Sequence, residues 1–423
     1  MVTQKPVIVL KFGGTSVGDV SRVKLVADIV ARHRKESPDS NLIVVVSAMA
    51  GETNKLVALA KSCVERPNPR EMDVLLASGE QVTVSLLAMR LLEIGIPAKS
   101  LLAPQARIAT TAEHTNALIE GVDSERLNRM MEDGTVLVVA GFQGVTEDGD
   151  ITTLGRGGSD ITAVALAAAA NATACYIYTD VQGVFSTDPR MVKGAKLLER
   201  VSHEEMLELA SLGAKVLHTR SVYFAMRYNI PLVVLSTFAG ALEPGQNGTW
   251  IVPEGELMEK PIVTGVTYRL DEARIMIQGM SPDISKISNL FDVLAEKSVF
   301  IDMISQETVN ANSVNLSITV PDENSLTALE TIRAMVPELG AEGAMIDRDI
   351  AKVSVVGIGM RYHTGVAARV FRALAKERID IAMINTSEIK MSVLVPRKYC
   401  EVAVRALHDE FIDFDVATSE EAA

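Results

Sequence analysis

The stretch Val7-Ile-Val-Leu-Lys-Phe-Gly-Gly-Thr-Ser-Val-Gly18 joins an apolar run to a lysine, a glycine pair and two hydroxyls. The apolar run is typical of a buried parallel strand. Gly13 and Gly14 let a ligand approach the backbone closely, because neither carries a Cβ. Lys11 adds a positive charge beside them. The pattern predicts a phosphate-binding turn, and it differs from a P-loop because the chain has no Gly-x-x-x-x-Gly-Lys-Ser/Thr motif. Taken alone, it also fits an ordinary turn after a strand.

Length and composition are those of an ordinary globular protein. The 423 residues are enough for two or three domains, each with its own core. Hydrophobic residues make up 48% of the chain and charged residues 22%. The net charge of −13 argues against a surface for nucleic acid or for an anionic membrane, because phosphate-rich partners need a basic footprint.

The cysteines and the apolar segments predict a cytoplasmic protein. Cys63, Cys175 and Cys400 are far apart, which indicates a reducing compartment without disulfides. The N-terminal apolar run ends at Lys11 and does not resemble a secretory signal. The most apolar helical candidate, 161–174, is too short to cross a bilayer, so no membrane contact is expected.

The first 240 or so residues alternate apolar strands with amphipathic helices, which predicts an α/β fold with a largely parallel central sheet flanked by helices. Ligands of such domains gather at the carboxyl ends of the strands. The expected strands are 7–11, 42–47, 135–140, 174–178 and 232–235. The expected helices are 20–33, 72–93, 160–170 and 204–212. The segment 239–261, rich in Gly, Pro and Glu, is predicted to leave this domain.

An internal repeat follows. Ala273-Arg-Ile-Met-Ile-Gln-Gly279 returns as Ala351-Lys-Val-Ser-Val-Val-Gly357, about 78 residues later. Each copy is predicted to contain a strand, a loop, an amphipathic helix and two further strands. Two such α+β units either pack together for stability or form a paired small-molecule sensor, and the pattern leaves both open.

A second motif is Thr152-Thr-Leu-Gly-Arg-Gly-Gly-Ser-Asp160. Glycines around Arg156 free its guanidinium to meet a carboxylate in a two-bond fork. A helix is expected to begin at Asp160, where unpaired N–H groups favour an anion. The alternative is that Asp160 is a plain helix cap after a flexible loop.

Other candidates have weaker signals. Ser47 ends a predicted strand, and Glu80 lies in a helical context where it either holds an ammonium group or is a solvated charge. The run from Tyr178 to Arg190 suits a nucleotide pocket as well as a simple turn. Lys215, in Gly213-Ala-Lys-Val-Leu-His218, offers a second cation or an ordinary surface charge.

Together these motifs resemble the aspartate kinases of the amino-acid kinase superfamily. The stretches that carry the resemblance are Lys11-Phe-Gly-Gly-Thr-Ser, Ser47-Ala-Met, Gly141-Phe-Gln-Gly144, Gly155-Arg-Gly-Gly-Ser-Asp160, Thr179-Asp180, Asp188-Pro-Arg190 and Gly213-Ala-Lys215. The resemblance implies an amino-acid kinase domain over 1–245. It also implies two ferredoxin-like ACT modules, over 262–340 and 346–420, which match the repeat. The short remainder after the second module favours a monofunctional enzyme.

The implied reaction transfers the γ-phosphoryl group of ATP to the β-carboxylate of L-aspartate, the first step towards lysine, threonine and methionine. No general base is needed, because the carboxylate is already ionised at neutral pH. Catalysis should rest on positioning and on positive charge around the transferred group. Mg²⁺ is expected to arrive with the nucleotide, held by phosphate oxygens and waters, without a metal site of the chain's own.

The resemblance also implies a role for each matching residue. The expected catalytic residues are Lys11, Asp160 and Lys215. The expected ATP-binding residues are Lys11, Phe12, Gly13, Gly14, Thr179, Asp180, Phe185, Asp188, Arg190 and Lys215. The expected aspartate-binding residues are Ser47, Thr53, Glu80, Arg156, Gly157, Gly158 and Ser159. Among these, Arg156 would clamp the α-carboxylate and Glu80 the α-ammonium.

The ACT modules imply an amino-acid effector, lysine or threonine or both, and assembly of a homo-oligomer through the modules. Loops of this type commonly carry a glycine, and Tyr362-His-Thr-Gly-Val366 keeps it. The corresponding Met280-Ser-Pro-Asp-Ile-Ser285 has none, which leaves the effector's identity open. The expected effector residues are Asp302, Gln306, Thr386, Ser387 and Glu388.

Two rival functions remain. One is a kinase for a different small carboxylate, such as glutamate or an acetylated amino acid. A free α-amino substrate needs an anion such as Glu80, whereas an acetylated substrate does not. The other is a catalytically silent amino-acid sensor, against which the presence of Lys11, Arg156, Asp160 and Lys215 argues.

Overall fold

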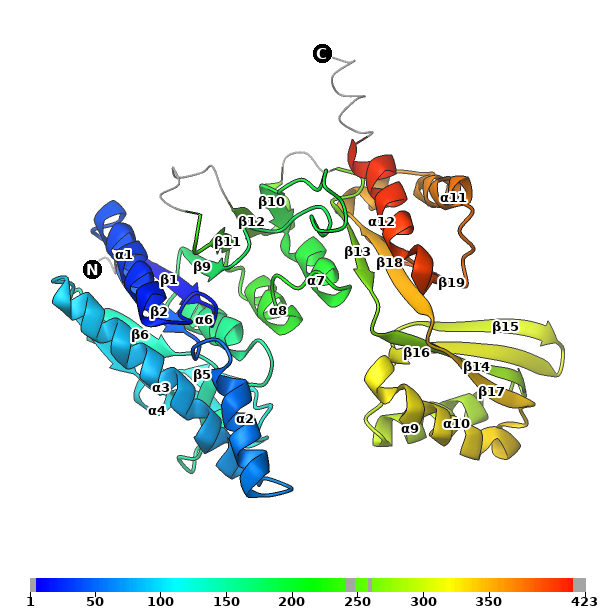
Figure 1. The fold of residues 1–423 in the computed structure, drawn as a ribbon, viewed down its shortest axis with the longest axis horizontal. Helices are drawn as coiled ribbons and strands as arrows, with labels where there is room; N and C mark the ends of the chain where they lie inside the picture. The colour runs from blue at the N-terminus through cyan, green and yellow to red at the C-terminus, as the bar shows by residue number, and fades with distance from the viewer. Residues whose placement is uncertain (1–4, 240–247, 258–260, 414–423) are drawn as a thin grey trace, which may run out of the picture. The chain divides into compact units, whose positions relative to one another are not determined.

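The computed structural model describes residues 5–239, 248–257 and 261–413. They form two compact units (Figure 1). The first contains the described residues up to 185 together with 197–210 and 215–257. The second contains 186–196, 211–214 and the described chain from 261 onward. Parts of the predicted connection 239–261, namely 240–247 and 258–260, lie outside the described residues, as do 414–420 of the predicted second module.

An eight-stranded, mostly parallel sheet forms the centre of the first unit, as the sequence predicts. Its order is β10-β12-β11-β9-β1-β2-β6-β3, and among the pairs only β11 with β12 is antiparallel. The strands are β1 (Val7–Phe12), β2 (Asn41–Val46), β3 (Ala98–Leu101), β6 (Val136–Ala140), β9 (Ala174–Thr179), β10 (Arg200–Ser202), β11 (Leu232–Ser236) and β12 (Thr249–Val252). All five strands expected from the apolar runs form within one residue of their expected ends.

The two faces of β1 pack against different helices because side chains alternate along a strand. Ile8, Leu10 and Phe12 share one core with α1 (Val20–Glu36) and α3 (Pro69–Glu93). Lys11 points the other way and pairs with Asp160 on α6 (Gly158–Ala169). This helix contacts β1, β2 and β9; α6 and β1 are both labelled in Figure 1. The remaining helices of this unit are α2 (Glu52–Cys63), α4 (Ala103–Ala106), α5 (Ser124–Met131), α7 (His203–Ser211) and α8 (Thr219–Arg227).

A second, four-stranded sheet in the first unit was not expected from the sequence. Its order is β5-β4-β7-β8, with bounds Ile119–Val122, Ile108–Thr110, Gln143–Val145 and Ile151–Thr153. Strands of three or four residues give too short an alternation to be recognised. The hairpin of β7 and β8 leads directly into the loop that carries Arg156.

The start of α6 differs from the expectation. The helix begins at Gly158 rather than at Asp160, and Gly157 precedes it with a φ of 71°, in the left-handed region that glycine adopts readily. Asp160 therefore lies in the first turn instead of capping the helix. This frees its carboxylate for a partner on the sheet.

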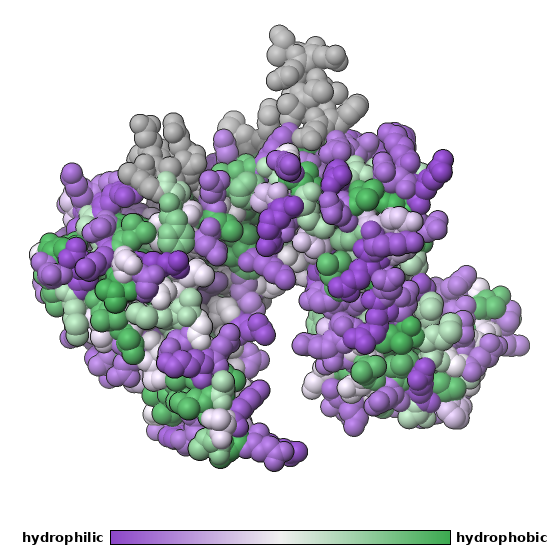
Figure 2. All heavy atoms as spheres, viewed as in Figure 1, coloured by the Kyte–Doolittle hydropathy of each residue, from purple (hydrophilic) through white to green (hydrophobic). Residues whose placement is uncertain are grey.

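In the described part of the chain, α3 is the one helix that is long and apolar enough to cross a membrane. It differs from 161–174, the most apolar helical candidate in the sequence. Half of the most apolar part of this helix is buried, and α3 packs against α1, β3, β6 and β8. It also buries Asp73 and Glu80, so α3 has the character of a core helix. In Figure 2, hydrophilic residues cover most of the displayed face and hydrophobic residues form separate patches.

Two antiparallel sheets form the second unit and correspond to the two repeats. The first has the order β15-β16-β14-β17, and the second β13-β18-β20-β19. The first contains β14 (Glu272–Met280), α9 (Ile284–Glu296), β15 (Ile304–Asn310), β16 (Ser313–Pro321), α10 (Ser325–Leu339) and β17 (Gly343–Asp347). The second contains β13 (Gly265–Arg269), β18 (Ile350–Val356), α11 (Val366–Lys376), β19 (Met383–Thr386), β20 (Lys390–Pro396) and α12 (Cys400–His408). Short 3₁₀ turns lie at Glu254–Glu256, Asp322–Asn324, Ile358–Tyr362 and Arg397–Tyr399, and a π-helical turn lies at Asp409–Asp413.

The pairing of β13 is not what a simple tandem arrangement would give. Gly265–Arg269 falls within 262–340, the range predicted for the first module, yet it pairs antiparallel with β18 of the second sheet. The first repeat is therefore inserted between β13 and the rest of the second sheet. Each sheet has its own core, beneath α9 and α10 in one case and beneath α11 and α12 in the other.

Candidate active site

The carboxyl ends of four neighbouring strands bring the N-terminal motifs to one edge of the large sheet. Phe12 is in register with both Val46 and Tyr178, and Val46 is in register with Ala140. The residues that follow these strand ends therefore lie side by side: Gly13, Ser47, Gly141 and, at the end of β9, Thr179. The structure thus gathers at one edge motifs that are more than a hundred residues apart in the chain.

Lys11 and Asp160 form an ion pair at this edge. Lys11 Nζ lies 2.5 Å from Asp160 Oδ1, and only 10% and 13% of their side chains are exposed. The pair joins β1 to the first turn of α6. The sequence placed both residues in the site, and the structure brings them into contact.

The glycine pair occupies a tight junction after β1. The N–H of Gly13 donates to Tyr178 O at 3.3 Å, and a Cβ on Gly14 would lie 2.9 Å from Ala48 O. The junction therefore has no room for a side chain at Gly14. Phe12 is fully buried, with its ring stacked on Tyr178 at 4.7 Å, so its side chain belongs to the core rather than to a ligand site.

Glu80 is a buried carboxylate with one oxygen unused. Its side chain on α3 is 2% exposed, and Oε1 accepts the N–H of Ala48 at 3.0 Å. Oε2 is buried and has no hydrogen-bond partner among the described residues. Burial raises the pKa of this carboxyl to about 7, although the Ala48 N–H opposes the shift. The solvated-charge alternative for Glu80 is thereby wrong.

Ala48 connects Glu80 to the glycine junction, because its N–H meets Glu80 while its carbonyl faces Gly14. Ser47, one residue earlier, donates its N–H to Phe12 O at 3.1 Å and is half-buried. Thr53 lies in the first turn of α2 and is also half-buried. Ser159 packs against Gly141, where a Cβ would lie 2.7 Å from the Ser159 Cβ.

Arg156 lies at the tip of an exposed loop between two glycines with positive φ, Gly155 at 73° and Gly157 at 71°. Its side chain is exposed and has no ion-pair partner among the described residues. Gly158 is buried at the start of α6. The loop thus presents a guanidinium whose hydrogen-bonding groups are available to a ligand.

His218 is a neighbour of this loop that the sequence analysis missed. It precedes α8, packs against Gly157 and accepts the N–H of Arg220 at 3.3 Å through Nδ1. Burial, with Arg220 as a second cause, lowers its pKa. Lys215 lies three residues earlier in the same unit, is exposed and has no ion-pair partner among the described residues. No pattern in the sequence distinguishes His218 from a surface histidine.

The residues proposed to line a nucleotide are divided between the units. Thr179 Oγ1 donates to Asp180 Oδ1 at 3.2 Å at the end of β9, and Phe185 is half-buried beyond it. Asp188 and Arg190 belong to the second unit. There the two form an ion pair at 2.8 Å, and the hydrogen bonds from Arg190 and the N–H of its backbone hold the pKa of Asp188 low despite partial burial.

The second unit contains a pocket of about 470 Å³ on the second repeat. Thr386, Ser387 and Glu388 line it, together with Gly365, whose φ is 91°, at the start of α11. Gln306 lies apart from this pocket, on the exposed strand β15. Asp302 contacts Lys352, which is 1% exposed and also lies 2.5 Å from the buried Glu272. The carboxylate of Asp302 therefore already has a cationic partner between the two repeats.

No group of three or more His, Cys, Asp or Glu residues that could hold a metal ion occurs within the ranges that the structure describes. The site at the sheet edge consists instead of cations, N–H groups and two carboxylates, of which Asp160 is engaged with Lys11. Such a donor set suits a metal ion that arrives bound to phosphate oxygens.

The chain is similar to known proteins over most of its length. Residues 6–236 match the amino acid kinase family, and 353–411 match the ACT domain. The chain is 50% identical over 405 residues to the aspartate kinase Ask_LysC of Stutzerimonas stutzeri, covering 96% of this chain and 97% of that one. It is also similar to Escherichia coli aspartokinase III solved with aspartate and ADP, at a TM-score of 0.75 and 26% identity, with 96% and 99% of the chains covered. The lysine and aspartate complex of that enzyme matches over the same 96% and 99%, at 26% identity and a TM-score of 0.71.

Proposed function

This chain belongs to the aspartate kinases of the amino acid kinase family, and on that premise we propose how its own residues carry the reaction. The reaction transfers the γ-phosphoryl group of ATP to the β-carboxylate of L-aspartate, giving 4-phospho-L-aspartate and ADP. It is the first step towards lysine, threonine and methionine and takes place in the cytoplasm, in keeping with three free cysteines.

The observation that carries the proposal is the double contact of Ala48, which holds Glu80 on one side and faces the glycine junction on the other. A site for an ammonium group and a site for phosphate are thereby adjacent. The unused, buried Oε2 of Glu80 suits the α-ammonium of a free amino acid, since an ammonium replaces the hydrogen bonds that burial removes. An acetylated amino acid has no such group, which disfavours an acetylated substrate but not glutamate.

Arg156 binds the α-carboxylate of the same substrate. Its planar fork offers two parallel hydrogen bonds to a carboxylate, and its side chain has no competing ion pair among the described residues. Ser47, Thr53, Ser159 and the backbone of Gly157 and Gly158 complete the aspartate pocket. With both ends of the amino acid held, the β-carboxylate is left to face the phosphate.

The β-carboxylate of aspartate and the γ-phosphoryl group are both anions and repel each other, and positively charged side chains reduce this repulsion. Lys11 and Lys215 neutralise the transferring phosphoryl group, and Asp160 orients Lys11 through the 2.5 Å ion pair. Gly13 and Gly14 allow the β- and γ-phosphates to approach the backbone. Phe12 acts through its backbone, since its ring is in the core.

The nucleotide binds beside β9, along Thr179, Asp180 and Phe185 of the first unit. A nucleotide-binding role for Asp188 and Arg190, which belong to the second unit, stays a prediction from the sequence. The ADP complex of E. coli aspartokinase III supports nucleotide binding by this chain. Mg²⁺ bound to the phosphates supplies further charge neutralisation during the transfer.

Catalysis is assigned to the domain predicted over 1–245 and feedback control to the modules predicted over 262–340 and 346–420. The effector is an amino acid, and the pocket of about 470 Å³ lined by Thr386, Ser387 and Glu388 is its site. The lysine complex of E. coli aspartokinase III supports lysine as the first effector to test, with threonine as the second. Asp302 and Gln306 of the first module do not line this pocket, and a role for them in effector binding stays a prediction from the sequence. The modules also assemble a homo-oligomer, for which the wholly exposed strand β15 offers an edge.

The test is a trapping assay. The protein is incubated with Mg-ATP, hydroxylamine and a panel of amino acids, and any acyl phosphate is captured as its hydroxamate. Product with aspartate, and none with glutamate or acetylated amino acids, is expected. Absence of product with aspartate would overturn the proposal, and repeating the assay with lysine, threonine and methionine identifies the effector.

A further inference from the structure

Asp73 is a fully buried carboxylate on α3 that the proposed mechanism does not use. It lies seven residues before Glu80 on the same helix. Seven residues are about two turns, so both carboxylates project from the same side of α3, about 10 Å apart along its axis. A buried charge is costly unless it is fully hydrogen-bonded, which directs attention to its partners.

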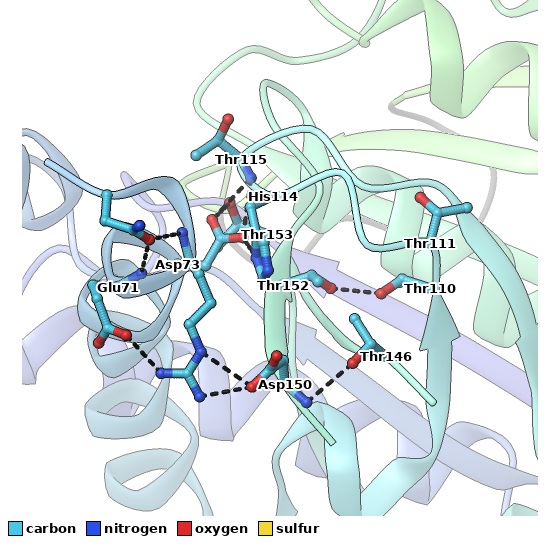
Figure 3. A network of polar contacts seen from close by, with 12 residues as sticks. Glu71, Asp73, Thr110, Thr111, His114, Thr115, Thr146, Asp150, Thr152 and Thr153 are labelled. Carbon is cyan, nitrogen blue, oxygen red and sulfur yellow. Dashed lines mark hydrogen bonds and ion pairs between the residues drawn. The ribbon is translucent and has the colours of Figure 1, made fainter. Parts of the chain in front are cut away.

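The carboxylate of Asp73 is held by two segments that are separate in the sequence (Figure 3). Thr153, at the end of β8, donates its hydroxyl to Oδ1 at 2.6 Å. The N–H of Thr115 lies 3.1 Å and 3.0 Å from the two oxygens, and His114 Nδ1 lies 2.9 Å from Oδ2. Every partner thus comes from β8 or from the turn around residue 115.

Both segments continue directly to the loop that carries Arg156. Thr153 is three residues before Arg156. In the turn, Asn116 approaches Gly155 so closely that a Cβ there would lie 2.7 Å from Asn116 Oδ1. Arg220 ties the two together, because Nη1 donates to Leu154 O at 2.8 Å and to Asn116 Oδ1 at 3.3 Å. The base of the Arg156 loop is therefore fixed on both sides, while the side chain at its tip remains exposed.

We infer that Asp73 is a positioning residue for aspartate recognition: it anchors the Arg156 loop to the helix that carries Glu80. A single rigid helix then sets the separation between the group that binds the α-carboxylate and the group that binds the α-ammonium. This inference rests on the proposed roles of Arg156 and Glu80. It differs from them in that Asp73 does not contact the substrate.

The chain offers a matched control in the same region. Asp150 lies in the β7–β8 hairpin and accepts Arg70 Nη2 at 2.6 Å and Nε at 3.1 Å, again joining this hairpin to α3 (Figure 3). Its side chain is 38% exposed, and exposed ion pairs contribute little. Asp73→Asn and Asp150→Asn each remove the charge of a carboxylate that joins α3 to the β7–β8 hairpin. Only Asp73→Asn changes the anchor of the Arg156 loop.

Asp73→Asn replaces an oxygen that accepts N–H groups by an amide that donates, so at least one hydrogen bond to a charged acceptor is lost. We expect the KM for aspartate to rise about tenfold or more, with kcat and the KM for ATP within about twofold of the wild type. Asp150→Asn should leave all three constants unchanged. Thr153→Val removes only the hydroxyl and should raise the aspartate KM less strongly. Thr153→Ser keeps a hydroxyl and should leave the aspartate KM close to that of the wild type. These two variants test the inference if Asp73→Asn does not fold.

A double-mutant cycle shows whether the effect passes through Arg156. In an Arg156→Ala background, Asp73→Asn should raise the aspartate KM no further, because the loop no longer carries the binding group. Additive effects in the cycle, or a loss of thermal stability with an unchanged aspartate KM, would show that Asp73 is structural only. The wild type is assayed for hydroxamate formation in parallel. If the proposed function is wrong, the wild type forms no product either; if only the inference about Asp73 is wrong, the wild type still forms product.

Discussion

Lys11 Nζ on β1 lies 2.5 Å from Asp160 Oδ1 in the first turn of α6, and both side chains are nearly buried. The pair fixes the position of the Lys11 ammonium group at the carboxyl edge of the sheet, next to the glycine junction. Its position follows from the alternation of β1, which sends Leu10 and Phe12 into one core and Lys11 towards α6.

Lys11→Ala should abolish turnover while leaving the fold intact. Loss of one group that stabilises transition-state charge typically costs a factor of about 10² to 10³ in kcat, and we expect at least that. The measurement is kcat by the hydroxamate assay, with circular dichroism as the check on folding. Lys55→Ala is the control, because Lys55 is exposed and pairs with Glu52 at 3.2 Å on the surface of α2. A folded Lys11→Ala protein with near-normal rates would remove Lys11 from the catalytic group.

Arg156→Ala should act mainly on aspartate. The loss of a two-bond contact to a carboxylate predicts an aspartate KM raised about 100-fold, with the KM for ATP unchanged. Arg156→Lys keeps the charge but not the fork, so it should recover only part of the affinity. Initial rates over a range of aspartate concentrations provide the measurement. An unchanged aspartate dependence in Arg156→Ala would mean that the α-carboxylate binds elsewhere.

Effector sensitivity should respond to the pocket on the second repeat. Glu388 lines that pocket and pairs with Arg361 at 3.1 Å. Glu388→Gln should raise the lysine concentration needed for half-inhibition about fivefold or more, without changing the basal kinetics. Glu401→Gln, which alters an exposed pair with Arg405 at 2.8 Å on α12, is the matched control. Equal inhibition of both variants would place the effector outside this pocket, and Gln306→Ala then tests the first repeat.

The sequence predicts five of the eight strands of the large sheet, because these five are apolar runs that are recognisable locally. The shorter strands β3, β10 and β12 are not predicted. Lys11, Arg156 and Asp160 are identifiable for a related reason, since glycines surround them in short, specific motifs. The small sheet, the pairing of β13 with β18, and the neighbours Asp73 and His218 are not predictable in this way. Each depends on contacts between segments that are distant in the sequence. In the sequence, nothing distinguishes Asp73 from any other acidic residue near the start of a helix.

Glu80 illustrates the same limit, because only the fold reveals its burial. Its pKa is raised by burial from 4.5 to about 7, so between these pH values the folded protein holds a proton that the unfolded chain has released. The contribution of Glu80 to stability therefore falls as the pH rises through that window and is least favourable above pH 7. Aspartate binding reverses the preference, since the α-ammonium stabilises the ionised carboxylate.

Two consequences of Glu80 titration can be measured together. Below about pH 7, kcat/KM for aspartate should fall towards tenfold per pH unit, as the protonated carboxyl no longer attracts the ammonium. Glu80→Gln should lose this pH dependence and most of its aspartate affinity. Without ligand at pH 8 it should nevertheless unfold several degrees higher than the wild type, because a penalty on the order of 2–3 kcal/mol for a buried charge is gone. Glu71→Gln, on the exposed side of the same helix, is the control and should change neither the pH profile nor the unfolding temperature. If Glu80→Gln keeps the pH profile of the wild type, the ammonium group is bound by another residue.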